Sequence, residues 1–432
     1  MTTSTVPVSG RLLLHDVSVQ EGLGRASVAD QSILIEGNRI QTVMPSSQAP
    51  VDDPDIEVLH LRGRTVMPGM TLGHSHIAYV DVMTARDTLF KYSLPELTLH
   101  AAHHAGQMLR LGYTGLVGAG SVAGIDMALK KMIGQGLVKG PRVTACSRDL
   151  MVSAPPDRRN PEVARRIPVD LMPVVDTAQE MVERTDKEID EGAEIIKTFS
   201  SGDDTYPNAK SYELLYSRDE LAAVVERAHA RNVRVRAHSR GLDGIRNALA
   251  AGVDVVDHAT YADEEALQTM AERGVFVVPS LYQPRQLLLH GQEHGKTPEY
   301  LEALDFQKEI DNTLWLLPRA VELGIPLVAG DDFGFAWTPH GTYAEELACY
   351  VEVAGIPAAT VLTWATANGA ALAGRGDDAG IIAPGRLADL VVTAGDPAQD
   401  IRVLCRPESI EMVLLDGRTA YAQSDRAVRT GR

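Results

Sequence analysis

The sequence predicts an α/β protein whose centre is a (β/α)8 TIM barrel, with a small β-sandwich domain formed from both chain termini. Two observations predict this fold. Eight short apolar runs recur between residues 65 and 332, each followed by enough chain for a helix. Segments of β character without a helical period precede and follow them. Repeated strand–helix units imply a parallel sheet, and eight of them imply a closed barrel.

The first 62 residues contain β-rich segments such as "RLLLHDVSV" and "IEVLHLRGRTV", and Gly37-Asn38 is typical of a hairpin turn. Segments of the same β-rich character return after about residue 380, in "GIIAPGRLADLVVTAGD" and "IEMVLLDGRTAY". The simplest arrangement pairs the two terminal segments. We therefore predict a discontinuous β-sandwich of residues 1–62 plus 380–432 and a barrel of residues 63–379.

The barrel strands are expected at the apolar runs, because amphipathic stretches such as "ELTLHAAHHAGQMLRLG" lie between them. Several helices are expected to end at a Gly or Asn that leads directly into the next strand. The eight expected strands are 65–76, 114–120, 142–148, 194–202, 233–239, 253–260, 275–281 and 325–332.

The composition limits the class of partner. The formal net charge is −17, whereas nucleic acids and anionic membranes require clustered lysine and arginine. No apolar run approaches the ~18 to 20 residues that span a bilayer, and the N-terminal residues lack the pattern of a secretory signal. Cys146, Cys349 and Cys405 lie far apart and form no disulfide framework. We expect a cytoplasmic protein that acts on a small molecule.

Polar residues stand at the C-terminal ends of five runs, where barrel enzymes build their active sites. Each has a plain interpretation alone: a histidine packed in the core, a lysine paired with a carboxylate, or an aspartate that caps a helix. Together at one end of the barrel they indicate a metal site. They are His74, His76, Lys197, His238, His258 and one of Asp331 and Asp332.

These residue types indicate two divalent metal ions, most simply Zn2+. Imidazole and carboxylate suit zinc, whereas magnesium and calcium prefer mostly oxygen ligands. Burial favours a neutral lysine amine, which can add carbon dioxide to form a carbamate. We expect His74, His76 and the aspartate to hold one metal. His238 and His258 would hold the second, with a carbamate on Lys197 and a hydroxide between the two metals.

With these motifs the chain resembles the amidohydrolase superfamily of metal-dependent hydrolases. It is most similar to the prolidase-like branch, with an imidazolonepropionase-type composite β-sandwich. The resemblance rests on "PGMTLGHSHI", "GAEIIKTFSSG", "VRVRAHSRGLDGIRNALAAGVDVVDHATY", "PLVAGDDFG" and the tail "AGIIAPGRLADLVVTAGDP", and it covers most of the chain. It implies hydrolysis of acyl-amino acids, dipeptides or related amides. Because such barrels are often dimers or larger, a homo-oligomer is expected.

The resemblance also implies two catalytic residues. The family pattern on the eighth strand is Gly-Ser/Thr-Asp, which aligns Asp332 with the ligand and Asp331 with the small polar position. In the family this aspartate carries a proton from the bridging water to the leaving group. Tyr216 matches a family tyrosine that could hydrogen-bond the substrate carbonyl or the tetrahedral intermediate. An aromatic side chain packed at a helix start explains Tyr216 equally simply.

The chain departs from the branch in its substrate loops. The branch commonly has a histidine after the third strand, whereas this loop has Arg148, Arg158 and Arg159. Any of them could bind a substrate carboxylate. Arg240 follows the fifth-strand histidine, where the family often has a small or neutral residue. It is a second candidate for that role, or a loop arginine in solvent. Candidate substrate contacts after the eighth strand are Trp337, His340 and Tyr343.

We therefore predict an amidohydrolase that cleaves an amide, peptide-like or cyclic amide C–N bond. One alternative is a mononuclear deaminase of a heterocycle, but this class usually has a Glu after the fifth-strand histidine, where this chain has Ser239, Arg240 and Gly241. An esterase or lactonase could use the same site. A non-catalytic scaffold would have lost ligands, whereas this ligand set is complete.

Overall fold

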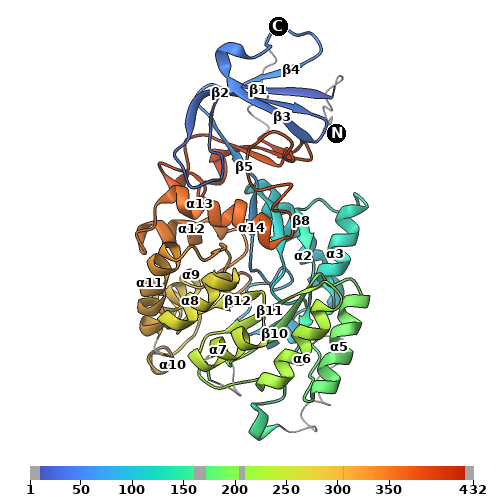
Figure 1. Ribbon diagram of the computed structural model, residues 1–432, viewed down its shortest axis with the longest axis vertical. Coiled ribbons are helices and arrows are strands. Elements are labelled where there is room, and N and C mark those ends of the chain that lie inside the picture. Colours follow the sequence, from blue (N-terminus) through green and yellow to red (C-terminus); the bar gives the residue numbers. More distant parts are fainter. Residues whose placement is uncertain (1–9, 160–171, 204–209, 305, 424–432) are drawn as a thin grey trace.

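The computed structural model describes residues 10–159, 172–203, 210–304 and 306–423. Its larger part contains parallel strands with helices around them, and strands from both ends of the chain form a smaller part at one end (Figure 1). The predicted α/β class with parallel sheets is confirmed. Within the described ranges, no helix is both long and apolar enough to cross a membrane.

The smaller part is one hydrogen-bonded sheet of eight strands, in the order β16-β15-β14-β5-β1-β2-β3, with β4 also paired to β1. It includes strands from both terminal segments, and the hairpin expected at Gly37-Asn38 joins β2 and β3. The sandwich and the domain boundaries stay predictions. The strands are β1 (Arg11–Val19), β2 (Val28–Glu36), β3 (Arg39–Pro45), β4 (Glu57–His60), β5 (Thr65–Pro68), β14 (Leu390–Thr393), β15 (Ile410–Leu415) and β16 (Arg418–Ala422).

The parallel strands of the larger part form two sheets, ordered β13-β12-β11-β10-β9 and β6-β7-β8. Two expected strands are divided. The run 65–76 supplies β5 to the terminal sheet and β6 to the parallel one, and the run 142–148 supplies β8 and β9. The strands are β6 (Met70–Leu72), β7 (Tyr113–Val117), β8 (Arg142–Thr144), β9 (Cys146–Asp149), β10 (Ile195–Phe199), β11 (Arg234–Ser239), β12 (Val255–His258) and β13 (Phe276–Pro279).

The division of the run 65–76 has a local cause at Gly69, which lies between β5 and β6. A Cβ atom on Gly69 would come 2.0 Å from Thr114 Oγ1. The chain therefore passes close to Thr114 of β7 as it leaves one sheet and enters the other. Only glycine allows this approach without a shift of the neighbouring side chain.

The helices surround the parallel strands, and several begin with the capping boxes that the sequence contains, such as Ser217 with Glu220 before α6. The helices are α1 (Ala85–Lys91), α2 (Leu94–Arg110), α3 (Ile125–Gly134), α5 (Ala178–Asp190), α6 (Arg218–His229), α7 (Leu242–Ala251), α8 (Glu264–Arg273), α9 (Tyr282–His290), α10 (Pro298–Ala303), α11 (Phe306–Glu322), α12 (Tyr343–Glu352), α13 (Ala358–Ala365) and α14 (Ala367–Leu372).

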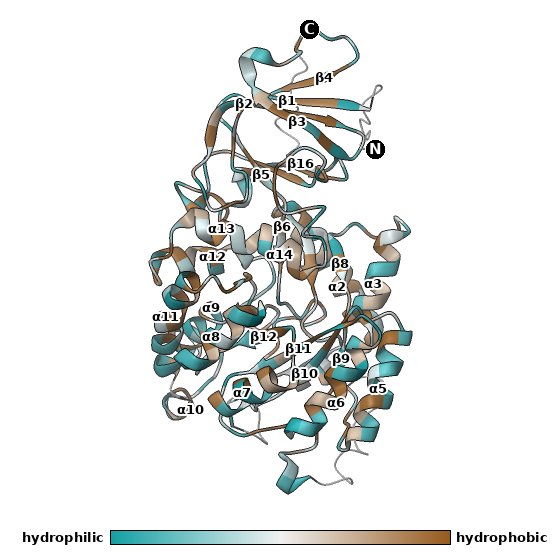
Figure 2. Cartoon of the chain, in the orientation of Figure 1, coloured by the Kyte–Doolittle hydropathy of each residue, from teal (hydrophilic) through white to brown (hydrophobic). Residues whose placement is uncertain are grey.

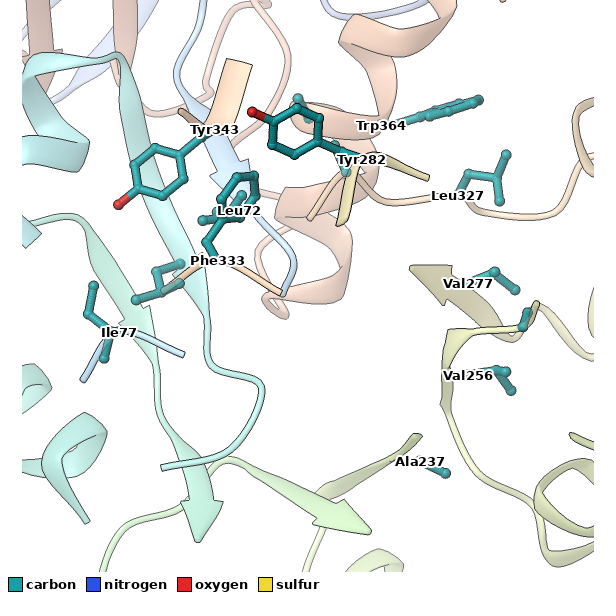
Figure 3. Close-up of a cluster of buried hydrophobic side chains, with 14 of the residues drawn as sticks. Leu72, Ile77, Ala237, Val256, Val277, Tyr282, Leu327, Phe333, Tyr343 and Trp364 are labelled. Carbon is teal, nitrogen blue, oxygen red and sulfur yellow. The ribbon is translucent and has the colours of Figure 1, made fainter. Parts of the chain in front are cut away.

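The main apolar core lies between the strands and the helices. Helix α6 contributes Leu221, Val224, Val225 and Ala228 at helical spacing, while outer helices such as α8 carry many hydrophilic residues (Figure 2). Figure 3 shows Ala237, Val256 and Val277 of three successive strands following one another along one side of this core. A separate apolar cluster comprises Val117, Cys146, Ile195, Val255, Val278, Val328 and Leu372.

The eighth expected strand, residues 325–332, joins its neighbours by isolated hydrogen bonds, including a parallel bridge of Leu327 with Val277, rather than by a regular ladder. Val328 N donates to Val277 O at 2.9 Å, and Gly73 N donates to Ala329 O at 2.8 Å. The segment therefore lies between β13 and the residues after β6. This is the place that an eighth barrel strand would take, and complete closure stays a prediction.

Arg142 on β8 links the parallel part to the terminal sheet. Its Nε and Nη2 donate to the carboxylate of Asp389, at 2.9 and 3.1 Å. Asp389 precedes β14 and is only 5% exposed. A buried carboxylate needs such a partner, because it has lost its hydration.

We predict that Arg142→Ala lowers the free energy of unfolding by about 3 kcal/mol, because it leaves the buried carboxylate of Asp389 without its cation. Urea unfolding at pH 7 measures the loss. Arg62→Ala is the matched control: it removes an exposed arginine from Asp16 and should cost less than about 1 kcal/mol. Equal losses in the two variants would contradict the proposed importance of this link.

Candidate metal centre

His74 and His76 follow β6 and lie against Asp332. His74 Nε2 is 2.9 Å from Asp332 Oδ1, and His76 Nε2 is 3.4 Å from the same oxygen. Both imidazoles are buried. Gly330 permits this approach, because a Cβ atom on it would come 2.3 Å from His74 N. The ends of the first and eighth expected strands therefore meet.

His238 and His258 lie beside this group, with their ring centroids 4.7 Å apart. His238 pairs in register with Asp257, and His258 pairs with Ser239. Regular alternation would therefore point the two histidines to opposite faces. The positive φ of 70° at His258 breaks the alternation at the strand end, and its Nε2 comes within 3.9 Å of Asp332 Oδ2.

The two adjacent aspartates have different surroundings. Asp331 accepts hydrogen bonds from Ser280 Oγ at 2.8 Å and from Gln283 N at 2.9 Å, so its carboxylate holds the start of α9. The carboxylate of Asp332 instead faces His74, His76 and His258. These contacts support Asp332 as the ligand, and the assignment stays a prediction.

Lys197 lies beneath the histidines in a cluster of buried charges. Its Nζ donates to Asp257 Oδ2 at 2.7 Å. Arg236 donates to the same carboxylate through Nε at 3.1 Å and through Nη2. His74 Nδ1 lies 3.2 Å from Asp257 Oδ1 and 3.0 Å from Arg236 Nη2. If Nδ1 donates to this carboxylate, the lone pair of His74 Nε2 is free for a metal.

Asp257 and Arg236 are not among the site residues that the sequence predicts. Both offered a signal. Arg236 precedes His238 by two residues in a strand, so the two side chains share a face. Asp257 is a carboxylate inside an apolar run, immediately before His258. A buried carboxylate in such a run needs a cation, and the sequence offers Arg236 on the neighbouring expected strand and Lys197 one strand further.

The ionisation of the site suits metal binding. Burial lowers the pKa of His74, and it lowers the pKa of His238 to about 4. Burial also holds the pKa of His258 well below its usual range. For Asp332, burial would raise the pKa, but the neighbouring imidazoles of His258 and His74 outweigh it and hold the pKa well below its usual range. Neutral imidazoles and an ionised carboxylate are the forms that bind metals.

The donor atoms also fit a divalent ion geometrically. His74, His76 and Asp332 offer ligand atoms within 4.8 Å of one another, and so do His258, Asp331 and Asp332. Among the described residues, the buried atoms His76 Nδ1 and His258 Nε2 have no hydrogen-bond partner. A buried polar atom without a partner is costly, and a metal would supply the missing partner of His258 Nε2.

Tyr216 is fully buried, and its hydroxyl donates to the carbonyl of Leu150. Burial raises its pKa. It does not line the cavity beside the metal centre. These contacts support the packing interpretation of Tyr216 rather than a contact with substrate.

Trp337 packs with Leu287 and Leu301 and stacks on Phe335, with ring centroids 5.4 Å apart. Phe335, which the sequence did not single out, is the aromatic residue of this loop that lines the cavity. Trp337 therefore supports the wall from behind.

His340 also lies behind the site. Its Nδ1 is 2.9 Å from Tyr343 Oη, and its Nε2 is 3.3 Å from the carbonyl oxygen of His76. Its ring stacks on that of His104, with centroids 3.9 Å apart. His340 and Tyr343 thus support the loop that carries His76 and do not line the cavity.

The arginines that the sequence suggested as readers of a substrate carboxylate all contact carboxylates of the protein. Arg240 is 3% exposed and donates to Asp203 and Glu309, at 2.7 and 2.9 Å. Its Nη2 also lies 3.7 Å from Asp332 Oδ2. Arg148 contacts Glu188 and Glu191, Arg158 contacts Glu213, and Arg159 contacts Glu220.

A cavity adjoins the candidate metal centre. Its walls combine the metal-binding candidates with three aromatic rings and two further carboxylates. The lining residues are His76, Tyr79, Asp149, Lys197, Phe199, Asp203, His238, Gln283, Asp332 and Phe335.

The fold and the histidine–aspartate group agree with the sequence match. Residues 65–420 match the model of the amidohydrolase family, so the chain belongs to this family. It is 29% identical to ochratoxinase of Aspergillus niger over 250 residues, which cover 57% of this chain and only 50% of that protein. The chain thus spans about half the length of this relative.

Two longer comparisons agree with the family. The imidazolonepropionase of Nocardia farcinica (strain IFM 10152) is 25% identical over 443 residues, covering 98% of this chain and 100% of that protein. Among solved structures, a prolidase complexed with N-methylphosphonate-L-proline is 27% identical. It superposes with a TM-score of 0.83 over 96% of this chain and 100% of that chain.

A buried carboxylate near the site makes stability depend on pH. Asp126 on α3 is fully buried, and burial raises its pKa to about 7. The unfolded chain would release this proton near pH 4. Between about pH 4 and 7 the folded state therefore binds more protons at Asp126, and this group's contribution to stability falls as pH rises.

We predict that Asp126→Asn removes this dependence. The unfolding free energy of the variant minus that of the wild type should rise between pH 4.5 and 7 by roughly 1.4 kcal/mol per pH unit. Denaturant unfolding at several pH values measures it. Asp377→Asn, at an exposed position, should give a flat difference. A flat difference for Asp126→Asn as well would contradict the prediction.

Proposed function

We propose that this protein is a metal-dependent hydrolase that cleaves a C–N bond in an amide, peptide-like or cyclic amide substrate. The observation that carries the proposal is the convergence of four buried histidines, from three separate segments, around Asp332. Membership of the amidohydrolase family supports it. So does the likeness to a prolidase over nearly the whole chain.

Two divalent metal ions, most simply Zn2+, would supply a nucleophile at neutral pH and polarise the scissile carbonyl. His74, His76 and Asp332 would hold one, and His238 and His258 the other. Lys197, which lines the cavity, would carry a carbamate between them. Asp257 would orient His74 through Nδ1, at the observed 3.2 Å.

Asp332 would also move the proton. Its two carboxylate oxygens face different histidines, Oδ1 towards His74 and Oδ2 towards His258. It would accept a proton as the carbonyl is attacked and deliver it to the leaving nitrogen. The aromatic walls of the cavity would exclude bulk water around this transfer.

Several finer predictions complete the proposal. The two parallel sheets would close into a (β/α)8 barrel through residues 325–332, with the terminal strands as its sandwich domain. The enzyme would act in the cytoplasm on a small molecule, as a homo-oligomer. Hydrogen bonds from the 325–332 segment to both neighbouring segments support the closure.

We predict that the wild type binds about two metal ions per chain and that a chelator abolishes amide hydrolysis. Lys197→Ala should lose bound metal and activity, and short carboxylic acids should partly restore both, because they replace the carbamate. Metal analysis and hydrolysis of N-acyl amino acids and dipeptides measure this. Lys187→Ala, at a half-exposed lysine on α5, should keep both. One metal in the wild type with full activity in Lys197→Ala would refute the binuclear centre.

We predict that Asp332→Asn lowers kcat by roughly two to four orders of magnitude, because it removes the proton carrier and a ligand. Asp331→Asn should mainly lower the melting temperature, because it weakens the hydrogen bonds to Ser280 and Gln283. Steady-state kinetics and thermal unfolding of both metal-loaded variants separate the two. A larger loss of kcat in Asp331→Asn would reverse the assignment.

A further inference from the structure

Asp149, the last residue of β9, lines the cavity and has no role in the proposed chemistry. Regular strand alternation would place Arg148 on the inner face with Cys146, and Asp149 outside. The register with β10 shows a bulge instead. Cys146 pairs with Ile195 and Asp149 pairs with Lys197, so β9 advances three residues where β10 advances two. Bulges of this kind re-aim side chains beside active sites.

The bulge sends the two neighbouring charges in opposite directions. Arg148 reaches α5, where its Nη1 is 3.0 Å from Glu188 Oε1. Asp149 reaches the cavity. Gly120 leaves room for its carboxylate, because a Cβ atom on Gly120 would come 2.0 Å from Asp149 Oδ1.

Asp149 is only 5% exposed, yet the Oδ1 atom of its carboxylate has no hydrogen-bond partner among the described residues. No described cation forms an ion pair with it. The nearby cations are already paired: Lys197 with Asp257, and Arg240 with Asp203 and Glu309. A buried carboxylate oxygen that lacks a partner in the protein is suited to one supplied by a ligand.

The rest of the cavity wall suits a cation as well. The second carboxylate of this wall, Asp203, is already paired with Arg240. The rings of Tyr79, Phe199 and Phe335 add apolar walls whose faces attract positive charge. A substrate carboxylate would instead meet the carboxylate of Asp149 and no unpaired arginine of the described chain.

From this geometry we propose that Asp149 forms a subsite for a positively charged group of the substrate, a protonated amine or a guanidinium. The subsite rests on the proposed function, and it narrows the substrate class to cationic amides. The charge could come from a free α-amine or from a basic side chain. Asp149 would bind it by a charge-assisted hydrogen bond, and the aromatic walls would pack around its carbon chain.

Matched substrate pairs test the proposal with the metal-loaded enzyme at pH 7. One pair is a dipeptide with a free α-amine and its N-acetyl form, and the other exchanges lysine for norleucine. We expect kcat/KM to favour the charged member of at least one pair by tenfold or more. Asp149→Asn should reduce that preference to within about threefold, with its metal content unchanged. Glu191→Gln removes a carboxylate on the outer side of β9 and should keep the preference.

Binding of 2-phenylethylamine, compared with neutral 2-phenylethanol by calorimetry, separates the subsite from the proposed function. If no amide is hydrolysed but the amine binds in a manner that depends on Asp149, the function fails and the subsite stands. If amides are hydrolysed without preference for charge, or Asp149→Asn keeps the preference, the subsite is overturned. Loss of metal from Asp149→Asn would also overturn it, since Asp149 would then be a metal ligand.

Discussion

The carboxylate of Asp257 binds the guanidinium of Arg236 and the unmodified amine of Lys197, and the position of the candidate metal centre depends on this buried cluster. Lys197 and Arg236 both donate to it inside the protein, where an unpaired charge would be strongly destabilising. Arg236 also donates through Nη1 to the carbonyls of Gly73 and Gly118. One guanidinium thereby ties β11 to the chain after β6 and after β7, and so fixes where His74 lies.

The arginines near the site pair with some of its carboxylates and leave others available to a substrate. Arg240 draws Asp203 and Glu309 together behind His238, so its own charge is largely cancelled. Paired in this way, it stiffens the wall of the cavity rather than presenting a cation to it. The charge that a substrate meets is therefore set by the carboxylates left over after these pairings. Among the described residues that line the cavity, the carboxylate of Asp149 is such a remainder.

Sequence patterns identified the strand ends well but could not fix side-chain direction. The ends of the runs that carry His74, His238 and Asp332 do meet, because parallel strands bring their carboxyl ends to one edge. The left-handed conformation of His258 and the bulge before Asp149 follow from tertiary contacts, which local alternation does not contain. The sequence suggested arginines as readers of a substrate carboxylate for a related reason. It shows which residues are charged but not which carboxylates of the protein they contact.

The bulge in β9 also offers a route by which evolution could change the charge of this site. Arg148 and Asp149 are adjacent at the bulge. The one extra residue that the bulge adds to β9 decides which of the two side chains faces the cavity. If β9 instead paired regularly with β10, with no change of sequence, Arg148 would take the place of Asp149 opposite Lys197 and put a base where the cavity now has an acid. A family could thus reverse the charge it selects through a slip in register, with no new side chain invented.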